Sequence, residues 1–146
     1  MFKNFSLANF SVFMQQVGKS LMLPVAVLPV AGLFLGLGSA NIIYGPVSQV
    51  MQAGGRVIFS NLALIFAIGV TLGFTKNDGT AALSAAVGYL VMVATMSAVA
   101  VHFLGRNPAA EAKELQMVIG LMSVDTGVFG GILIGGVSAF LFNRFY

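Results

Sequence analysis

Residues 21–40, LMLPVAVLPVAGLFLGLGSA, decide the fold, because they form a stretch of 20 residues without a charged side chain. A helix needs about 20 mostly apolar residues to cross the hydrocarbon core of a bilayer. A helix on the surface of a soluble protein would carry a polar face, and this stretch has none. The sequence therefore predicts a transmembrane helix over residues 21–40.

Three more apolar stretches are long enough to cross a membrane. They are residues 57–75, 80–104 and 126–143. The whole chain of 146 residues is 58% hydrophobic and only 8% charged. In a soluble domain, about a quarter of the residues are charged. Seven Lys and Arg and four Asp and Glu cannot coat a soluble fold of this size. We predict one all-α membrane domain with about four transmembrane helices.

The segment before the first span has a different pattern. In residues 1–19, phenylalanines recur at three- to five-residue steps and are separated by Asn, Ser and Gln. We interpret residues 1–19 as an amphipathic helix that lies in the membrane interface and is closed by Lys19. A frayed terminus is the alternative.

Composition and motifs exclude several kinds of chemistry. The chain has no cysteine, so it has no disulfide framework, thiolate metal site or cysteine nucleophile. Its basic residues are spread along the chain, whereas a nucleic-acid-binding surface clusters them. It has no phosphate-cradling loop, metal-ligand spacing or nucleophile elbow. We expect no catalytic residue, metal or cofactor in this chain and no nucleic-acid partner, with membrane lipid as its surroundings.

Two prolines stand inside the first span. Pro24 and Pro29 lack an N–H, which leaves the carbonyls of Ser20 and Val25 without their helical donors and bends the helix. In hydrocarbon, a neighbouring helix or a wet cavity must lie against this face. The sequence is compatible with an ordinary kink in a packed bundle and with a broken helix beside a transport path.

Glycines recur at four-residue spacing in three of the predicted spans. Such spacing places a groove on one helix face, where the backbone of another helix can approach closely. The candidate helix-packing residues are Gly32 and Gly36, Gly69 and Gly73, and Gly127, Gly131 and Gly135.

Two ionisable side chains stand near the ends of spans. Asp125 precedes the last span, where it and Thr126 are best explained as the N-cap, with residues 117–124 at the interface or in a short dipping segment. A buried ligand for a proton or a sugar is the alternative for Asp125. His102 lies two residues from the end of the third span and is interpreted as an interfacial side chain rather than a phosphoryl acceptor.

The distribution of basic residues gives a weak signal for orientation. With the N-terminus inside, cytoplasmic segments hold Lys3, Lys19, Lys76 and Arg144, and outer segments hold Arg56, Arg106 and Lys113. Because two lysines precede the first span, we expect both termini in the cytoplasm. The polar stretch 106–116 is then expected outside, in part as a solvated helix.

The order of several segments resembles the membrane (IIC) domain of glucose-type permeases of the bacterial phosphoenolpyruvate-dependent phosphotransferase system. The resemblance covers nearly the whole chain. Its blocks are KSLMLPV (19–25), LPVAG (28–32), GLGSAN (36–41), AGG (53–55), LIFAIGV (64–70), GFTKNDG (73–79), DTGVFGG (125–131) and FNRFY (142–146).

The resemblance implies a protein of the bacterial inner membrane that imports glucose or a related hexose and phosphorylates it through IIA and IIB partners. It also implies a homodimer. Such permeases are about three times as long, and their sugar-holding segments and IIB cysteine have no counterpart here. The chain then resembles the N-terminal part of a IIC domain, which supplies scaffold and dimer helices rather than phosphoryl-transfer residues. The alternative is a truncated, inactive membrane module that acts only as an assembly partner.

If any residues here approach sugar or the docking face for IIB, the resemblance points to the loop after the second span. Its candidate residues are Lys76, Asn77 and Asp78. The competing explanation is a turn that needs Asn, Asp and Gly for its backbone angles.

Overall fold

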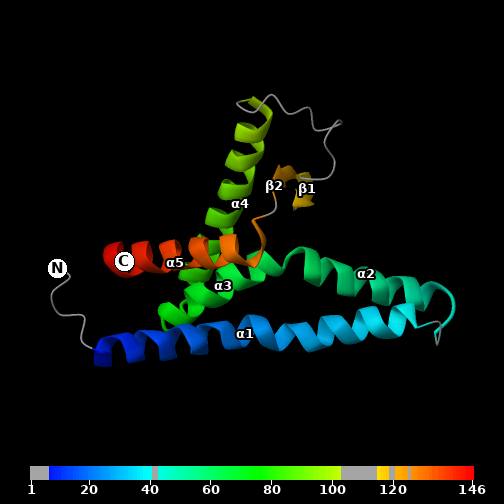
Figure 1. Ribbon diagram of the computed structural model, residues 1–146, viewed down its shortest axis with the longest axis horizontal. Coiled ribbons are helices and arrows are strands. Elements are labelled where there is room, and N and C mark those ends of the chain that lie inside the picture. Colours follow the sequence, from blue (N-terminus) through cyan, green and yellow to red (C-terminus); the bar gives the residue numbers. More distant parts are fainter. Residues whose placement is uncertain (1–6, 41–42, 103–114, 119–120, 125) are drawn as a thin grey trace.

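A computed structural model of the chain describes residues 7–40, 43–102, 115–118, 121–124 and 126–146. Helices dominate this part of the chain, as predicted, and a small hairpin is added to them (Figure 1). The elements are α1 (Leu7–Ser39), α2 (Pro46–Ser60), α3 (Leu62–Phe74), α4 (Gly79–His102), β1 (Leu115–Val118), β2 (Leu121–Val124) and α5 (Gly127–Phe145).

The first helix is longer than the sequence predicts. α1 runs for 33 residues without a break at Lys19 and continues through both Pro24 and Pro29. Lys19 is a good helix former and the single glycine before it is tolerated, so nothing in this region ends a helix. The expectation of a separate helix closed by Lys19 is therefore corrected. The interfacial position of its first turns stays a prediction.

The second predicted span, residues 57–75, is divided between two helices. α2 begins at Pro46 and ends at Ser60, and α3 begins at Leu62 after a bend of 56°. Gly45, with φ 88°, and Pro46 at the first helical position start α2. The segment 47–52, expected to form one or two isolated turns, is thus the beginning of a 15-residue helix.

Three helices, α1, α4 and α5, are long and apolar enough to cross a membrane by themselves, and the bent pair α2–α3 could provide a fourth crossing. Their large apolar side chains point outward: Leu83 is 67% exposed and Phe140 is 69% exposed. Such an outer surface fits lipid rather than water.

Within residues 117–124, expected at the interface or in a short dipping segment, the structure has strands, while their position relative to the membrane stays a prediction. β1 and β2 pair antiparallel, with Leu115 opposite Val124 and Val118 opposite Leu121. β2 lies beside α4 (Figure 1). A helix of this length would leave most of its backbone groups unpaired, whereas a hairpin pairs some of them between its two strands.

α3 is the central element of the fold. It packs against α1, α4 and α5 and touches α2, while α4 runs across the direction of α1 and α5 in Figure 1. Ala63 and Ala67 of α3 form a buried cluster with Tyr89 and Val93 of α4. The small side chains of α3 let its neighbours approach closely, and those contacts define the candidate site.

Candidate functional site

The closest contact between α1 and α3 joins two pairs of residues at four-residue spacing. Gly73 lies against Ser20, and Gly69 lies against the ring of Pro24. A Cβ on Gly73 would lie 2.5 Å from Ser20 Cα, so no larger residue fits there without a shift of backbone. Because position 20 meets 73 and position 24 meets 69, the two helices run antiparallel at this crossing.

This crossing covers the backbone that Pro24 leaves exposed. Pro24 removes the helical donor of the Ser20 carbonyl, and that oxygen lies 3.5 Å from the position of a Cβ on Gly69. The Ser20 hydroxyl donates to the Val17 carbonyl at 2.7 Å. α3 is thus the neighbouring helix against the Pro24 face. Pro29, in contrast, is exposed.

α3 and α5 meet through a second set of small residues. Gly131 lies against the backbone of Ala63, and Gly135 lies against the backbone of Ala67. The buried Thr71 hydroxyl is 2.9 Å from the Gly135 carbonyl and 2.9 Å from the Ala67 carbonyl. Its single hydrogen is shared between these acceptors or serves one at a time. This bond ties the two helices at the point of closest packing.

The other candidate packing glycines have different surroundings. Gly32 and Gly36 are exposed on α1, and no atom of the described residues comes within 4 Å of a Cβ placed on either. Gly127 has φ 58° and forms the first residue of α5. Gly32 and Gly36 therefore leave a small-residue face of α1 open.

Sequence reasoning missed the contact between α1 and α2. Ser48 and Gln52 of α2 both donate to the Gly38 carbonyl, at 2.6 and 2.7 Å. This carbonyl belongs to the last turn of α1 and has no partner within the helix. Gly55 lies against Leu35. The close spacing of Gly36 and Gly38 at a helix end was the available signal for this contact.

The loop that contains Lys76, Asn77 and Asp78 is a tight turn from α3 into α4. Lys76 and Asn77 have φ of 55° and 64°, and the Asn77 N–H donates to the Leu72 carbonyl at 2.9 Å. One Asp78 oxygen accepts from the N–H and the hydroxyl of Thr80, at 2.8 and 2.6 Å. These hydrogen bonds hold the pKa of the Asp78 carboxyl below its usual range. Asp78 therefore acts as the N-cap of α4.

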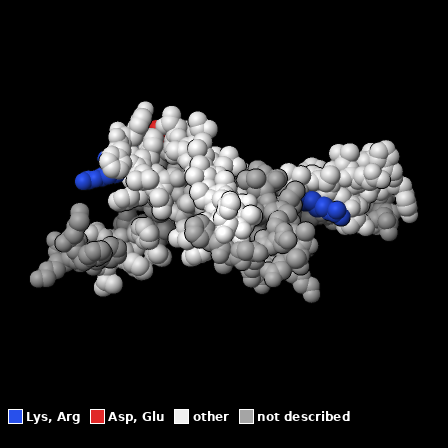
Figure 2. All heavy atoms as spheres, turned by 90° about the horizontal axis from the view of Figure 1, so that it is seen from above, with Lys and Arg blue, Asp and Glu red and all other residues white. Residues whose placement is uncertain are grey.

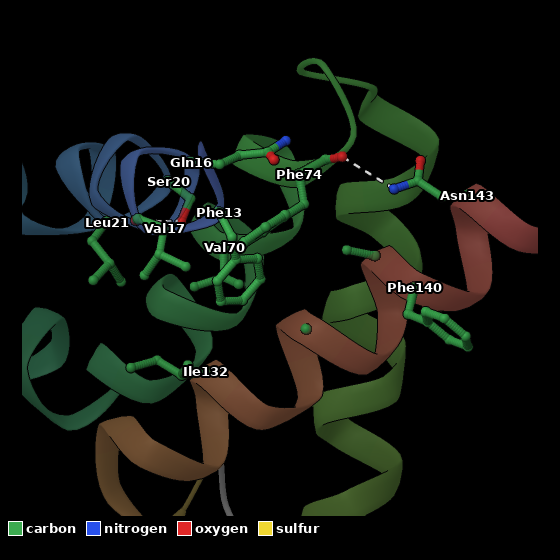
Figure 3. Close-up of a pocket in the computed structure, with 12 residues that line it drawn as sticks. Phe13, Gln16, Val17, Ser20, Leu21, Val70, Phe74, Ile132, Phe140 and Asn143 are labelled. Atoms are coloured by element: carbon green, nitrogen blue, oxygen red, sulfur yellow. Dashed lines mark hydrogen bonds between the residues drawn. The ribbon is translucent and has the colours of Figure 1, made fainter. Parts of the chain in front are cut away.

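A cavity of about 410 Å³ lies between α1, α3 and α5, and Figure 3 shows side chains that line it. Phe13, Val70 and Phe140 contribute to its apolar wall, and Gln16 and Asn143 contribute amides. The Asn143 amide donates to the Phe74 carbonyl at 3.1 Å, and the rings of Phe13 and Phe74 lie 5.8 Å apart. No acid or base lines this cavity, and its one hydroxyl, that of Ser20, already donates to the Val17 carbonyl, so the cavity is suited to apolar packing.

Lys76 and Asn77 line a second cavity, of about 390 Å³, on another side of α1 and α3. We call it the lysine hollow; it is lined by Lys19, Met22, Leu23, Ala26, Leu72, Gly73, Lys76 and Asn77. The hollow brings two of the three loop candidates together with Lys19. Asp78 does not line it.

The remaining candidates add no reactive centre. His102 is exposed at the last residue of α4. Asp125, Lys3 and the stretch 106–114 lie outside the described residues. Thr126 is the N-cap of α5 but makes no side-chain capping bond. Among the residues that the structure describes, no group of three His, Cys, Asp or Glu side chains could hold a metal ion.

Comparison of the sequence with protein-family models identifies the family of this chain. Residues 18–146 match the family model described as "Phosphotransferase system, EIIC". The match begins one residue before Lys19 and includes both helix crossings and the lysine hollow. It identifies the chain as an integral-membrane permease component of a sugar phosphotransferase system. The substrate of such a component is a sugar, and its partners are IIA and IIB components. The chain belongs to the EIIC family of the phosphotransferase system.

Proposed function

We propose that the chain forms the N-terminal part of the IIC domain of a glucose-type permease, which imports glucose or a related hexose with coupled phosphorylation. The observation that carries this proposal is the order of the sequence blocks from residue 19 to residue 146. The Asp125-Thr126-Gly127 and Asn143-Arg144-Phe145-Tyr146 blocks resemble the glucose branch more than the branches for N-acetylglucosamine or maltose.

Within that permease, the chain supplies scaffold. The blocks that carry the resemblance include the contact of Ser20 and Pro24 with Gly73 and Gly69, and they include Gly131, which packs against Ala63 just before the block 64–70. The cavity between α1, α3 and α5 is mostly apolar, and its one hydroxyl, that of Ser20, is engaged by the Val17 carbonyl. The phosphoryl-transfer residues accordingly belong to the rest of the permease and to IIB.

The open face of α1 is the proposed contact in a homodimer. It carries Gly32 and Gly36, and Leu33 beside them is 61% exposed. Small residues on an exposed apolar helix let a second helix approach closely in a membrane. The chain is placed in the bacterial inner membrane, with the Lys76–Asp78 turn toward cytoplasmic IIB.

The test uses bacterial cells that lack their own glucose permease. Three strains express the chain alone, the rest of a glucose-type IIC domain with its IIB, or both pieces together. We expect phosphorylating glucose uptake only in the third strain. Uptake by the chain alone would show that the phosphoryl-transfer residues were misplaced, and uptake of another hexose in preference to glucose would contradict the assigned substrate.

The same strains address the alternative role. A chain that co-purifies with the second piece but never supports uptake acts as an assembly module only. That result would contradict the proposed contribution to transport.

A further inference from the structure

The lysine hollow combines two cations with an apolar wall. Lys19 of α1 and Lys76 of the turn after α3 line the same space of about 390 Å³, although 56 positions separate them in the sequence. Met22 and Leu23, which are 73% and 55% exposed, continue the wall along α1. This arrangement offers positive charge at one side and apolar surface at the other.

No carboxylate neutralises the two lysines within the hollow. Asp78 is the only acidic residue in the described part of the chain, and it does not line the hollow. Its Oδ1 atom is engaged by the N–H and hydroxyl of Thr80. The charge of the hollow is therefore complementary to an anion.

The length of the charge-free stretch of α1 puts the two lysines at the expected depth of lipid headgroups. Residues 20–39 of α1 are free of charge and rise about 30 Å, the thickness of the hydrocarbon core. Lys19 precedes this stretch directly, so it lies at the membrane boundary. The contact of Gly73 with Ser20 brings the end of α3, and with it Lys76, to the same level.

We propose that the lysine hollow binds one anionic phospholipid. The ammonium groups of Lys19 and Lys76 contact its phosphodiester, and an acyl chain lies along Met22, Leu23 and Leu72. A free phosphate would use only the lysines and leave the apolar wall uncovered, whereas a phospholipid uses both. Basic residues at a membrane surface attract anionic lipid in this way, and the flexible Met22 adapts to an acyl chain.

The experiment titrates the purified full chain in detergent with phosphatidylglycerol and counts bound lipids by native mass spectrometry. The Lys19→Gln/Lys76→Gln variant should bind phosphatidylglycerol about tenfold more weakly than the wild type, or weaker still. The Arg56→Gln/Arg144→Gln variant removes the same charge from exposed positions elsewhere and should bind within about twofold of the wild type. Lys19→Arg/Lys76→Arg should retain binding.

Three results would overturn the proposal. The Arg56→Gln/Arg144→Gln variant could weaken binding of phosphatidylglycerol as much as the Lys19→Gln/Lys76→Gln variant does. The wild type could bind phosphatidylcholine as tightly as phosphatidylglycerol, or millimolar inorganic phosphate could displace phosphatidylglycerol. Circular dichroism shows whether each variant is folded. Acetylation of the wild-type chain gives a second measurement that needs no variant. Phosphatidylglycerol, but not phosphatidylcholine, should protect Lys19 and Lys76 relative to the other lysines, and equal modification with both lipids would also overturn the proposal.

Discussion

At the scale of single residues, Gly135 and Gly136 are neighbours on α5 with different surroundings. A Cβ on Gly135 would lie 2.5 Å from the Ala67 carbonyl oxygen and 3.0 Å from Val70 Cβ, whereas a Cβ on Gly136 meets nothing within 4 Å. Gly135→Ala should therefore lower the free energy of unfolding by about 1–3 kcal/mol, because α3 and α5 must move apart. Unfolding in detergent, followed by circular dichroism, measures this loss.

Gly136→Ala is the matched control for this prediction, since it makes the same chemical change one residue away. Its free energy of unfolding should stay at or slightly above the wild-type value, because alanine favours the helix. Similar losses in both variants would show that the helix backbone, rather than the contact with Ala67, determines the effect.

Asp78 contributes a pH dependence to stability. The hydrogen bonds from Thr80 lower the pKa of its carboxyl in the folded chain below the ordinary value of 3.8. The stabilising effect is therefore complete above about pH 4 and is lost as the pH falls through the lowered pKa. Asp78→Ala should lower the Tm by about 2–4 °C at pH 6, and this difference should shrink toward pH 3.

Asp78→Asn separates the cap from the charge. Asparagine accepts the same hydrogen bonds as an N-cap, so its Tm should stay near that of the wild type at pH 6. The contribution of residue 78 to the Tm should then be the same at pH 6 and at pH 3. A difference between Asp78→Ala and wild type that is independent of pH would contradict the assigned role of the carboxylate.

At the scale of elements, hydropathy predicts the helices well where charge and length agree. α4 and α5 begin and end within two residues of the third and fourth apolar stretches, as far as the described residues extend. The bend at Asn61 could not be predicted, because hydropathy continues across it. The Asn61 side chain donates to the Val57 carbonyl in the last turn of α2, and such capping leaves no trace in a hydropathy pattern.

The contacts between helices were only partly accessible from sequence. Four-residue spacing identified Gly69, Gly73, Gly131 and Gly135, which lie at helix crossings, but the same spacing includes Gly32 and Gly36 on an open face. Spacing defines a groove on one helix and does not identify its partner. The lysine hollow depends on which helices are neighbours, so sequence alone could not predict it.

The junction of α1 and α2 gives a prediction about an element. Ser48→Ala/Gln52→Leu removes both donors to the Gly38 carbonyl, each worth about 0.5–1.5 kcal/mol. Amides in the last turn of α1 and in α2 should then exchange hydrogen about tenfold faster, as measured by mass spectrometry, while amides of α3 and α5 stay unchanged.

Gln49→Leu is the control for this variant, because Gln49 is exposed on the same helix. It replaces a polar residue by the same apolar one without changing a bond to Gly38, and it should exchange as the wild type does. Faster exchange in the control would indicate a general effect on α2 rather than loss of the Gly38 contacts.

At the scale of the whole molecule, three basic residues of the predicted cytoplasmic side lie on elements that meet: Lys19 inside α1, Lys76 just after α3 and Arg144 in the last turn of α5. Lys19 and Lys76 share the lysine hollow, and Arg144 follows Asn143, whose amide binds the Phe74 carbonyl. Figure 2 shows blue Lys and Arg side chains at two separate places on the face in view. Arg56, which belongs to the predicted outer side, lies in α2.

This grouping leads to a prediction about orientation in the membrane. Positive residues near short loops are retained in the cytoplasm, so reporters fused after Asn77 and after Tyr146 should both be cytoplasmic. A reporter fused after Gly45, at the opposite end of α1, should be outside, since 20 charge-free residues separate Lys19 from residue 40. Alkaline phosphatase activity and fluorescence of a cytoplasmic reporter distinguish these sites. The hydrogen bond from Asn143 to the Phe74 carbonyl joins the ends of α3 and α5. Fusions after Asn77 and after Tyr146 on opposite sides of the membrane would separate these two ends. The packing of α3 against α5 could not then exist in one bilayer.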